Sequence, residues 1–204
     1  MIYDVRTYDL TPWSVPEFER RFGEALPERE KISRFGAFWH TDVGPLNRVV
    51  HVWPYENLED LREKRKAAHG SGKWPADLVE FMQDQHAEIM IPAPFMTELP
   101  NGKLGPLYEM HTATVIDRSV PEVLDRWKKV IDRRTRLSPL VACWYSELGL
   151  LNKFTHIWAY RDFAHRDQVH AEAKALGDWP PPMDDLTRFE ETAILLPASF
   201  SPLT

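Results

Sequence analysis

The first stretch of the chain alternates between residues that suit a sheet interior and residues that suit polar surroundings. Tyrosine, valine and threonine interleave with charged residues over 2–9, and this period of two is typical of a β-strand. Ser14 then begins a Ser-x-x-Glu pattern, which predicts a capping box and a helix to about residue 31. Phe18 and Phe22 recur at helical spacing, so they should lie on the buried face of that helix.

The pattern that follows predicts a hairpin, a helical region and a last strand. A turn containing Gly44 joins two strands, and Asn57 has the position and chemistry of a helix N-cap. A break with glycine and tryptophan interrupts the helical region. The predicted strands are 35–41, 47–55 and about 88–92, and the predicted helical segments are about 58–68 and 76–86. The order is β-α-β-β-α-β, the ferredoxin-like arrangement.

The whole pattern occurs twice, at a single shift of 105 residues and with no gap. Rare residues repeat at this shift: Trp39 with Trp144, Trp53 with Trp158, and Trp74-Pro75 with Trp179-Pro180. Such a repeat predicts an internal duplication. We expect a first domain over residues 1–99, a turn-rich linker over 100–106 and a second domain over 107–204.

A ferredoxin-like sheet with helices on one face leaves its other face exposed, and large exposed apolar sheet faces are rare in stable monomers. A tandem duplication can cover that face within one chain. We therefore expect an α+β protein in which two tandem ferredoxin-like (βαββαβ) domains pack their antiparallel sheets face to face, as a dimeric α/β barrel within one chain.

Composition restricts the partners of the 204-residue chain. There are 25 basic and 31 acidic residues, a net charge of −6, and no basic run that would suggest nucleic acid or an anionic membrane. Cys143 is the only cysteine, so an internal disulfide is excluded. No apolar run approaches the roughly 20 residues that span a bilayer, and the N-terminus has no signal-peptide pattern. We expect a cytoplasmic protein without nucleic-acid or membrane partners; unpaired edge strands leave room for a homodimer.

The hairpin and third strand carry a pattern of glycine, leucine, asparagine, histidine, tryptophan and tyrosine from Gly44 to Tyr55, repeated from Gly149 to Tyr160. With Tyr3-x-x-Arg6-Thr7-Tyr8, this resembles the NIPSNAP family of the dimeric α/β-barrel superfamily. The resemblance covers both halves and implies the barrel fold. It implies little about activity, because that superfamily includes cofactor-free monooxygenases, isomerases, lyases and haem enzymes. Eukaryotic NIPSNAP-like proteins are linked to mitochondria and to protein partners.

Strand alternation selects the candidate site residues. Tyr3 and Val5 suit packing against helices, so the opposite face of each strand should point into the barrel. Arginine can hold an anionic or carbonyl oxygen, and imidazole can move protons near neutral pH. The candidate catalytic residues are Arg6, His51, His111 and His156, and the candidate substrate-binding residues are Asp4, Tyr8, Trp53, Glu109 and Trp158.

Several interpretations of these residues stay open, including exposure at the surface if the two strand faces are assigned the wrong way round. They could form a structural polar network between the sheets, or a ligand pocket with acid–base groups for isomerisation, elimination or cofactor-independent oxidation. The chain could instead be a non-catalytic interaction module. Glu109, His111 and His156 match a facial metal-ligand set, but no further motif supports a metal, and we expect no metal. No phosphate loop or dinucleotide fingerprint is present, so we expect no cofactor. Lys64-Arg65-Lys66 should be a solvated helix face.

Overall fold

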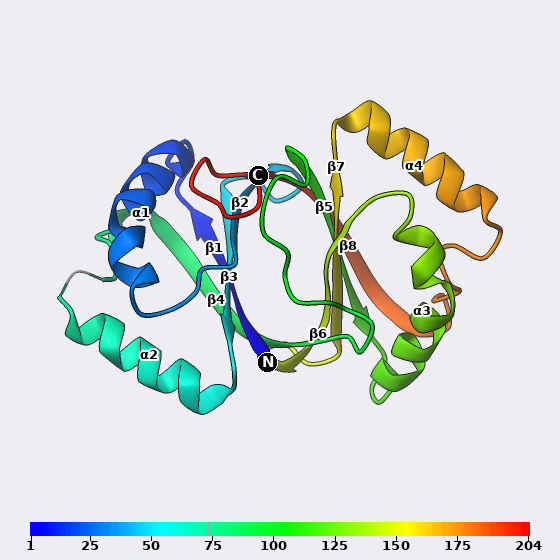
Figure 1. The fold of residues 1–204 in the computed structure, drawn as a ribbon, viewed down its shortest axis with the longest axis horizontal. Helices are drawn as coiled ribbons and strands as arrows, with labels where there is room; N and C mark the ends of the chain where they lie inside the picture. The colour runs from blue at the N-terminus through cyan, green and yellow to red at the C-terminus, as the bar shows by residue number, and fades with distance from the viewer. Residues whose placement is uncertain (73) are drawn as a thin grey trace.

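The structure, a computed structural model, describes residues 1–72 and 74–204. Its two halves have the same order of strands and α-helices (Figure 1). The first half contains β1 (Ile2–Leu10), α1 (Val15–Glu30), β2 (Ala37–Val43), β3 (Arg48–Tyr55), α2 (Leu58–Gly70), a short 3-10 helix η1 (Val79–Phe81) and β4 (Met82–Pro92). The second contains β5 (Leu107–Val115), α3 (Val120–Arg134), β6 (Leu140–Leu148), β7 (Lys153–Tyr160), α4 (Phe163–Ala175) and β8 (Thr187–Pro197).

The eight strands form one closed antiparallel barrel in the order β1-β3-β2-β8-β5-β7-β6-β4. The two halves are joined by hydrogen bonding between β2 and β8 and between β4 and β6. This confirms the tandem α/β barrel. It also leaves no free edge among the described strands, so edge strands offer no route to a homodimer, and the homodimer itself stays a prediction.

The barrel interior is a packed apolar core. Within the described part of the chain, every strand contributes buried residues to it and no helix does. Tyr3 packs on Trp144 with ring centroids 5.2 Å apart, and Trp39 packs on Tyr108 at 5.4 Å, so aromatic rings of the two halves meet in the centre. Small barrels are filled by their own side chains in this way. Burial raises the pKa of Tyr108 to about 12, as expected for a phenol in this core.

The face assignment made from the sequence was therefore wrong. Tyr3 and Val5 point into the barrel, whereas Asp4, Arg6 and Tyr8 lie on its outer face, beneath the helices. Alternation separated the two sets of side chains correctly. It could not orient them, because both faces of β1 are covered and the charge of Asp4 on the outer face is paired with Arg65 of α2.

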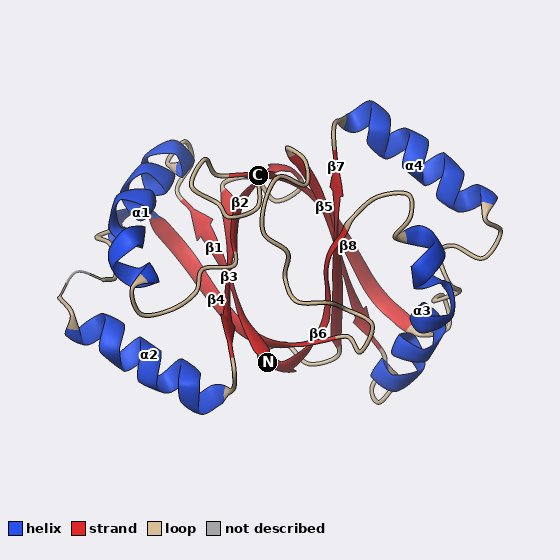
Figure 2. Ribbon diagram, in the orientation of Figure 1, coloured by secondary structure: helices blue, strands red, loops and turns tan. Residues whose placement is uncertain are grey.

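Helices cover the barrel on two opposite sides, α1 and α2 over the first half and α3 and α4 over the second (Figure 2). Phe18 and Phe22 of α1 pack on the outer face of β3 around Val49 and Trp53. In the second half Val123 and Trp127 of α3 take the same place over Phe154. The pockets described below lie within these two sheet–helix layers.

Two local predictions fail for identifiable reasons. Residues 76–86 do not form a helix: they hold η1 and the first half of β4, which pairs with β1 as far as Leu10. The hydrogen bonds that β4 forms with β1 outweigh the local helical preference of these residues. The capping box is also absent, because the Ser14 hydroxyl donates to the Thr11 carbonyl. Asn57 is confirmed as an N-cap, since its side chain accepts from two backbone N–H groups of α2.

No helix in the described part of the chain is both long and apolar enough to cross a membrane.

Candidate functional site

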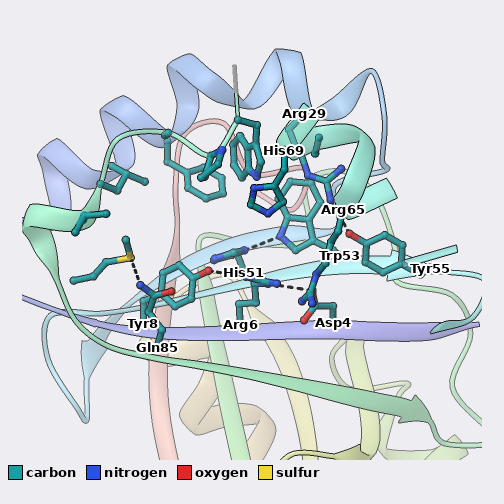
Figure 3. A pocket seen from close by; sticks show the side chains of 18 residues that line it. Asp4, Arg6, Tyr8, Arg29, His51, Trp53, Tyr55, Arg65, His69 and Gln85 are labelled. Carbon is teal, nitrogen blue, oxygen red and sulfur yellow. Dashed lines mark hydrogen bonds and ion pairs between the residues drawn. The ribbon is translucent and has the colours of Figure 1, made fainter. Parts of the chain in front are cut away.

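The first candidate site is a cavity of about 360 Å³ between the outer face of β1 and β3 and the covering α1 and α2 (Figure 3). The segment after α2 closes another side of it through Trp74 and Pro75. We call this the N-terminal pocket. All five candidate residues of the first half line it: Asp4, Arg6, Tyr8, His51 and Trp53.

A buried carboxylate organises one wall of the N-terminal pocket. Asp4 is 1% exposed, and its Oδ2 accepts hydrogen bonds from Arg6 Nε at 3.0 Å and from Arg65 Nη2 at 2.8 Å. Arg6 also donates from Nη1 to the Tyr8 hydroxyl at 3.0 Å. Burial alone would lower the pKa of Arg6, but the neighbouring Asp4 carboxylate and Tyr8 phenol raise it overall. The guanidinium is therefore a permanent cation at the cavity wall.

Arg65 corrects a further prediction. The sequence Lys64-Arg65-Lys66 suggested a solvated helix face, yet Arg65 reaches from α2 into the pocket to Asp4. Lys64 pairs with Asp60 at 2.8 Å along its own helix. The long side chain of Arg65 can extend from α2 to Asp4 while its alkyl stem covers apolar surface. The periodicity of α2 alone does not reveal this contact.

His51 lies directly opposite Arg6 in the register of β1 and β3. Its Nδ1 accepts a hydrogen bond from the Trp53 indole N–H at 2.8 Å. Since indole nitrogen only donates, Nδ1 is unprotonated and the proton of the neutral ring sits on Nε2. Burial, followed by the charge of Arg6, holds the pKa of His51 well below its ordinary value. His51 is therefore a neutral ring with an N–H on Nε2.

Arg29 is a part of this wall that the sequence reasoning missed. It is 4% exposed, donates to the Tyr55 hydroxyl at 2.8 Å, and lies 4.8 Å from the centroid of the Trp53 ring. Its counterpart Arg134 donates to Tyr160 at 2.9 Å and lies 3.9 Å from the Trp158 ring. The same shift of 105 residues relates the two arginines, so the repeat itself carried the signal.

The second candidate site is a larger cavity of about 710 Å³ in the equivalent place, between β5, β7 and the covering α3 and α4. We call it the C-terminal pocket. Aromatic side chains from α3, β7 and the segment after α4 form its apolar walls. Its lining includes the candidates Glu109, His111, His156 and Trp158, with Trp127, Arg134, Phe154, His170, Lys174 and Trp179.

Glu109 is the counterpart of Asp4 and is fully buried at 0% exposure. Arg166 donates to its Oε1, and its Oε2 receives His170 Nε2 at 2.8 Å and the Tyr160 hydroxyl at 3.1 Å. His111 Nε2 lies 3.3 Å from the same oxygen. Burial alone would raise the pKa of Glu109, but these donors hold it well below its ordinary value. The Glu109 carboxyl is therefore ionised near neutral pH.

The remaining imidazoles of the C-terminal pocket are already engaged. His156 Nδ1 accepts from the Trp158 indole at 2.8 Å, repeating the His51–Trp53 pair. His111 Nδ1 lies 2.9 Å from the Thr192 hydroxyl, and its ring stacks on His156 with centroids 4.7 Å apart. Burial, followed by the charge of His111, lowers the pKa of His156 well below its ordinary value.

The structure thus divides the candidate residues between two pockets on opposite sides of the barrel. The contacts of Glu109, His111 and His156 are not those of a facial metal site. No cluster of three possible metal ligands occurs among residues 1–72 and 74–204. Besides Arg29, Arg65 and Arg134, the sequence reasoning missed Arg166 and His170, both on α4. Helix residues were not considered because the candidates were chosen on strands alone.

The comparisons with known proteins agree on one family. The NIPSNAP profile matches the chain twice, over residues 3–97 and 108–202. Human NipSnap homolog 3A is 25% identical over 214 residues, which cover 100% of this chain and 86% of the human protein. Mouse NipSnap homolog 3B is 27% identical over 212 residues, which cover 98% of this chain and 85% of the mouse protein.

Solved structures share the fold across the full length. A Lactobacillus acidophilus protein provisionally described as a monooxygenase has a TM-score of 0.69 at 12% identity and covers 97% of this chain and 94% of its own. A Fusobacterium nucleatum protein with the same provisional description has a TM-score of 0.68 at 11% identity, covering 97% and 92%. At such identities the likeness concerns the fold alone.

Proposed function

The chain belongs to the NIPSNAP family, and from that premise we propose that its N-terminal pocket binds a small hydroxy acid with an aromatic or other apolar body. The candidate residues of the first half become, in this proposal, part of the wall of a pocket beneath α1 and α2. The ligand class follows from the charge, the free hydrogen-bonding groups and the shape of that pocket.

The charge of the pocket favours an anion. Among the described residues that line it, Arg6, Arg29 and Arg65 face one carboxylate, that of Asp4, although the chain as a whole carries a charge of −6. Asp4 fixes the guanidinium groups of Arg6 and Arg65 and neutralises only part of their charge. A preorganised cationic wall of this kind binds carboxylates through charge-assisted hydrogen bonds.

The observation that carries the proposal is a set of three buried polar atoms that have no hydrogen-bond partner among the described residues. They are Asp4 Oδ1, His51 Nε2 and Arg65 Nε, and all three belong to residues that line the cavity. A buried polar atom left unpaired costs about 1–3 kcal/mol. Asp4 Oδ1 accepts, whereas the neutral His51 ring and Arg65 donate, so a ligand that offers one hydroxyl and a carboxylate matches all three.

The rest of the lining suits an apolar body. Phe22, Trp53, Trp74 and Leu78 contribute ring and alkyl surface, and Trp74 meets Trp53 edge-on with centroids 5.9 Å apart. A volume of about 360 Å³ lies within the range of small-molecule sites. Aromatic walls with a few convergent polar groups are the usual form of such sites.

In this proposal His51 donates to the ligand instead of acting as a general base. The Trp53 indole occupies Nδ1, the nitrogen whose lone pair would take a proton. The Tyr8 hydroxyl, which accepts from Arg6, has its own proton available for a ligand oxygen. The N-terminal pocket is therefore suited to stabilising negative charge on oxygen.

Isothermal titration with 3-phenyllactate tests the proposal. The matched ligands are its neutral amide, which removes the carboxylate charge, and 3-phenylpropionate, which removes the hydroxyl. We expect the acid to bind at least tenfold more tightly than the amide, and 3-phenylpropionate to fall between them. Equal affinity of acid and amide, or no binding of the acid at millimolar concentration, contradicts the proposal.

A further inference from the structure

The two pockets differ at one pair of equivalent positions in a way that changes their chemistry. Arg65 of α2 and His170 of α4 are related by the shift of 105 residues, and both contact the buried carboxylate of their own half. Arginine stays protonated in proteins and cannot accept a proton. Histidine can do so, and it therefore gives Glu109 a proton-accepting partner at the position where Asp4 has Arg65.

The contacts of His170 determine its tautomer. Its Nε2 lies 2.8 Å from Glu109 Oε2, and that carboxylate, ionised and surrounded by donors, can only accept. The neutral ring therefore carries its proton on Nε2 and its lone pair on Nδ1. No described residue donates to Nδ1. A carboxylate that holds one ring N–H and supports the imidazolium is the arrangement that makes histidine an effective base.

No other imidazole of this pocket has the same freedom. His156 uses Nδ1 to accept from Trp158, and His111 uses its two nitrogens toward Glu109 and Thr192. His170 has a side chain 41% exposed and lines the cavity. Among the described residues of the pocket, it is the imidazole that can take a proton without breaking a hydrogen bond.

We infer that the C-terminal pocket is a proton-transfer site in which His170 Nδ1 is the general base and Glu109 positions it. The substrate class is a small organic carbonyl compound with an acidic C–H next to the carbonyl, such as a 2-keto acid. Lys174 and Arg134 in the lining supply positive charge for the oxygen, and Trp127, Trp158 and Trp179 supply apolar walls. This inference is independent of the ligand proposed for the N-terminal pocket.

The step balances without any co-reactant. The C–H bond next to the carbonyl breaks, and the proton forms an N–H bond on His170 Nδ1. The electron pair moves into the carbonyl group and gives an enolate, whose oxygen the cationic groups stabilise. The imidazolium, held against ionised Glu109, then returns the proton to the same carbon or to another position of the enolate. The outcome is proton exchange or isomerisation.

Deuterium uptake by phenylpyruvate in D2O tests the inference, with loss of the C3 proton signal followed by NMR. The decisive variant is His170→Arg, which reproduces the Arg65–Asp4 contact and removes the base. We expect the wild-type protein to accelerate exchange at least tenfold over this variant, whereas His165→Gln, at a half-buried histidine of the same helix that does not line the cavity, retains the full rate. Equal rates for the wild type and His170→Arg overturn the inference.

A second measurement reads the state of His170 without any substrate. Long-range ¹H–¹⁵N spectra of ring-labelled protein distinguish the two neutral tautomers. We expect the His170 signal to show a protonated Nε2 and an unprotonated Nδ1, and Glu109→Gln to disturb this signal. The opposite tautomer in the wild type overturns the inference. Neither readout depends on phenyllactate binding, so failure of the N-terminal proposal is recognised separately.

Discussion

Arg65 on α2 and His170 on α4 hold the same place in the two halves, and each lies 2.8 Å from the buried carboxylate of its own half, Asp4 or Glu109. The duplication has therefore kept a buried acid beneath each helical layer and changed the partner that reaches it. A permanent cation contacts one acid and a titratable ring contacts the other, and the chemistry proposed for the two pockets differs for this reason.

Arg65→Gln should weaken phenyllactate binding by about tenfold or more. The substitution removes a charge-assisted hydrogen bond, which contributes about 1.5–3 kcal/mol, and it leaves Asp4 with Arg6 as its one cationic partner among the described residues. Titration calorimetry of the variant against the wild type measures the effect. Lys66→Gln, an exposed position on the same helix, is the matched control. An equal loss in both variants would indicate a general field effect instead of a pocket contact.

Trp53→Phe should lower the free energy of unfolding by about 1–3 kcal/mol, because it leaves the buried His51 Nδ1 without its donor. Urea denaturation measures this change. Trp13 is 93% exposed, so Trp13→Phe should change the value by less than about 0.5 kcal/mol. If the two variants were equally stable, the indole–imidazole bond would not contribute to folding.

Trp39→Ala should destabilise the protein by about 3–5 kcal/mol, the usual cost of removing a large aromatic from a packed core. Trp39 is 0% exposed and meets Tyr108 of the other half at the centre of the barrel. Urea denaturation measures this loss of stability. A loss below about 1 kcal/mol would show that the barrel interior is loosely filled and would reopen it as a site for ligands.

Stability should fall as the pH decreases from 7 to 5, and His51 should account for part of the fall. Its pKa is depressed in the folded state, so the unfolded chain binds a proton near pH 6.5 while the folded chain stays neutral. The contribution of His51 to the free energy of unfolding is fully present above the pKa of the unfolded chain. Below that pKa it decreases by up to about 1.4 kcal/mol per pH unit.

The measurement is the urea midpoint of the wild type and of His51→Gln across this pH range. We expect a shallower fall in the variant, whatever its absolute stability. Parallel curves for the two proteins would mean that His51 takes up a proton as readily in the folded state as in the unfolded state, and the depressed pKa assigned to it would be wrong.

The sequence predicted the barrel because a shift of 105 residues and a period-two pattern are both properties of the chain itself. It also grouped Asp4, Arg6 and His51 correctly, since alternation divides the side chains of each strand between two faces. It could not say which face pointed inward, because both faces are buried in a barrel covered by helices. It missed Arg65 and His170 because their roles depend on how α2 and α4 pack against the strands, which no local pattern reports.

The tryptophans offer the most direct test of where a ligand binds. The chain has eight, and they sample each region: Trp53 and Trp74 line the N-terminal pocket, Trp127, Trp158 and Trp179 the C-terminal pocket, and Trp39 and Trp144 the barrel interior, while Trp13 is exposed. Their indole N–H signals can be followed together by NMR during one titration.

Titration with 3-phenyllactate should shift the indole signals of Trp53 and Trp74 and leave those of Trp39 and Trp144 in place. That result would locate the ligand between the outer face of β1 and β3 and the covering helices. Shifts at Trp39 and Trp144 without shifts at Trp53 and Trp74 would contradict the account, because they would locate the ligand inside the barrel.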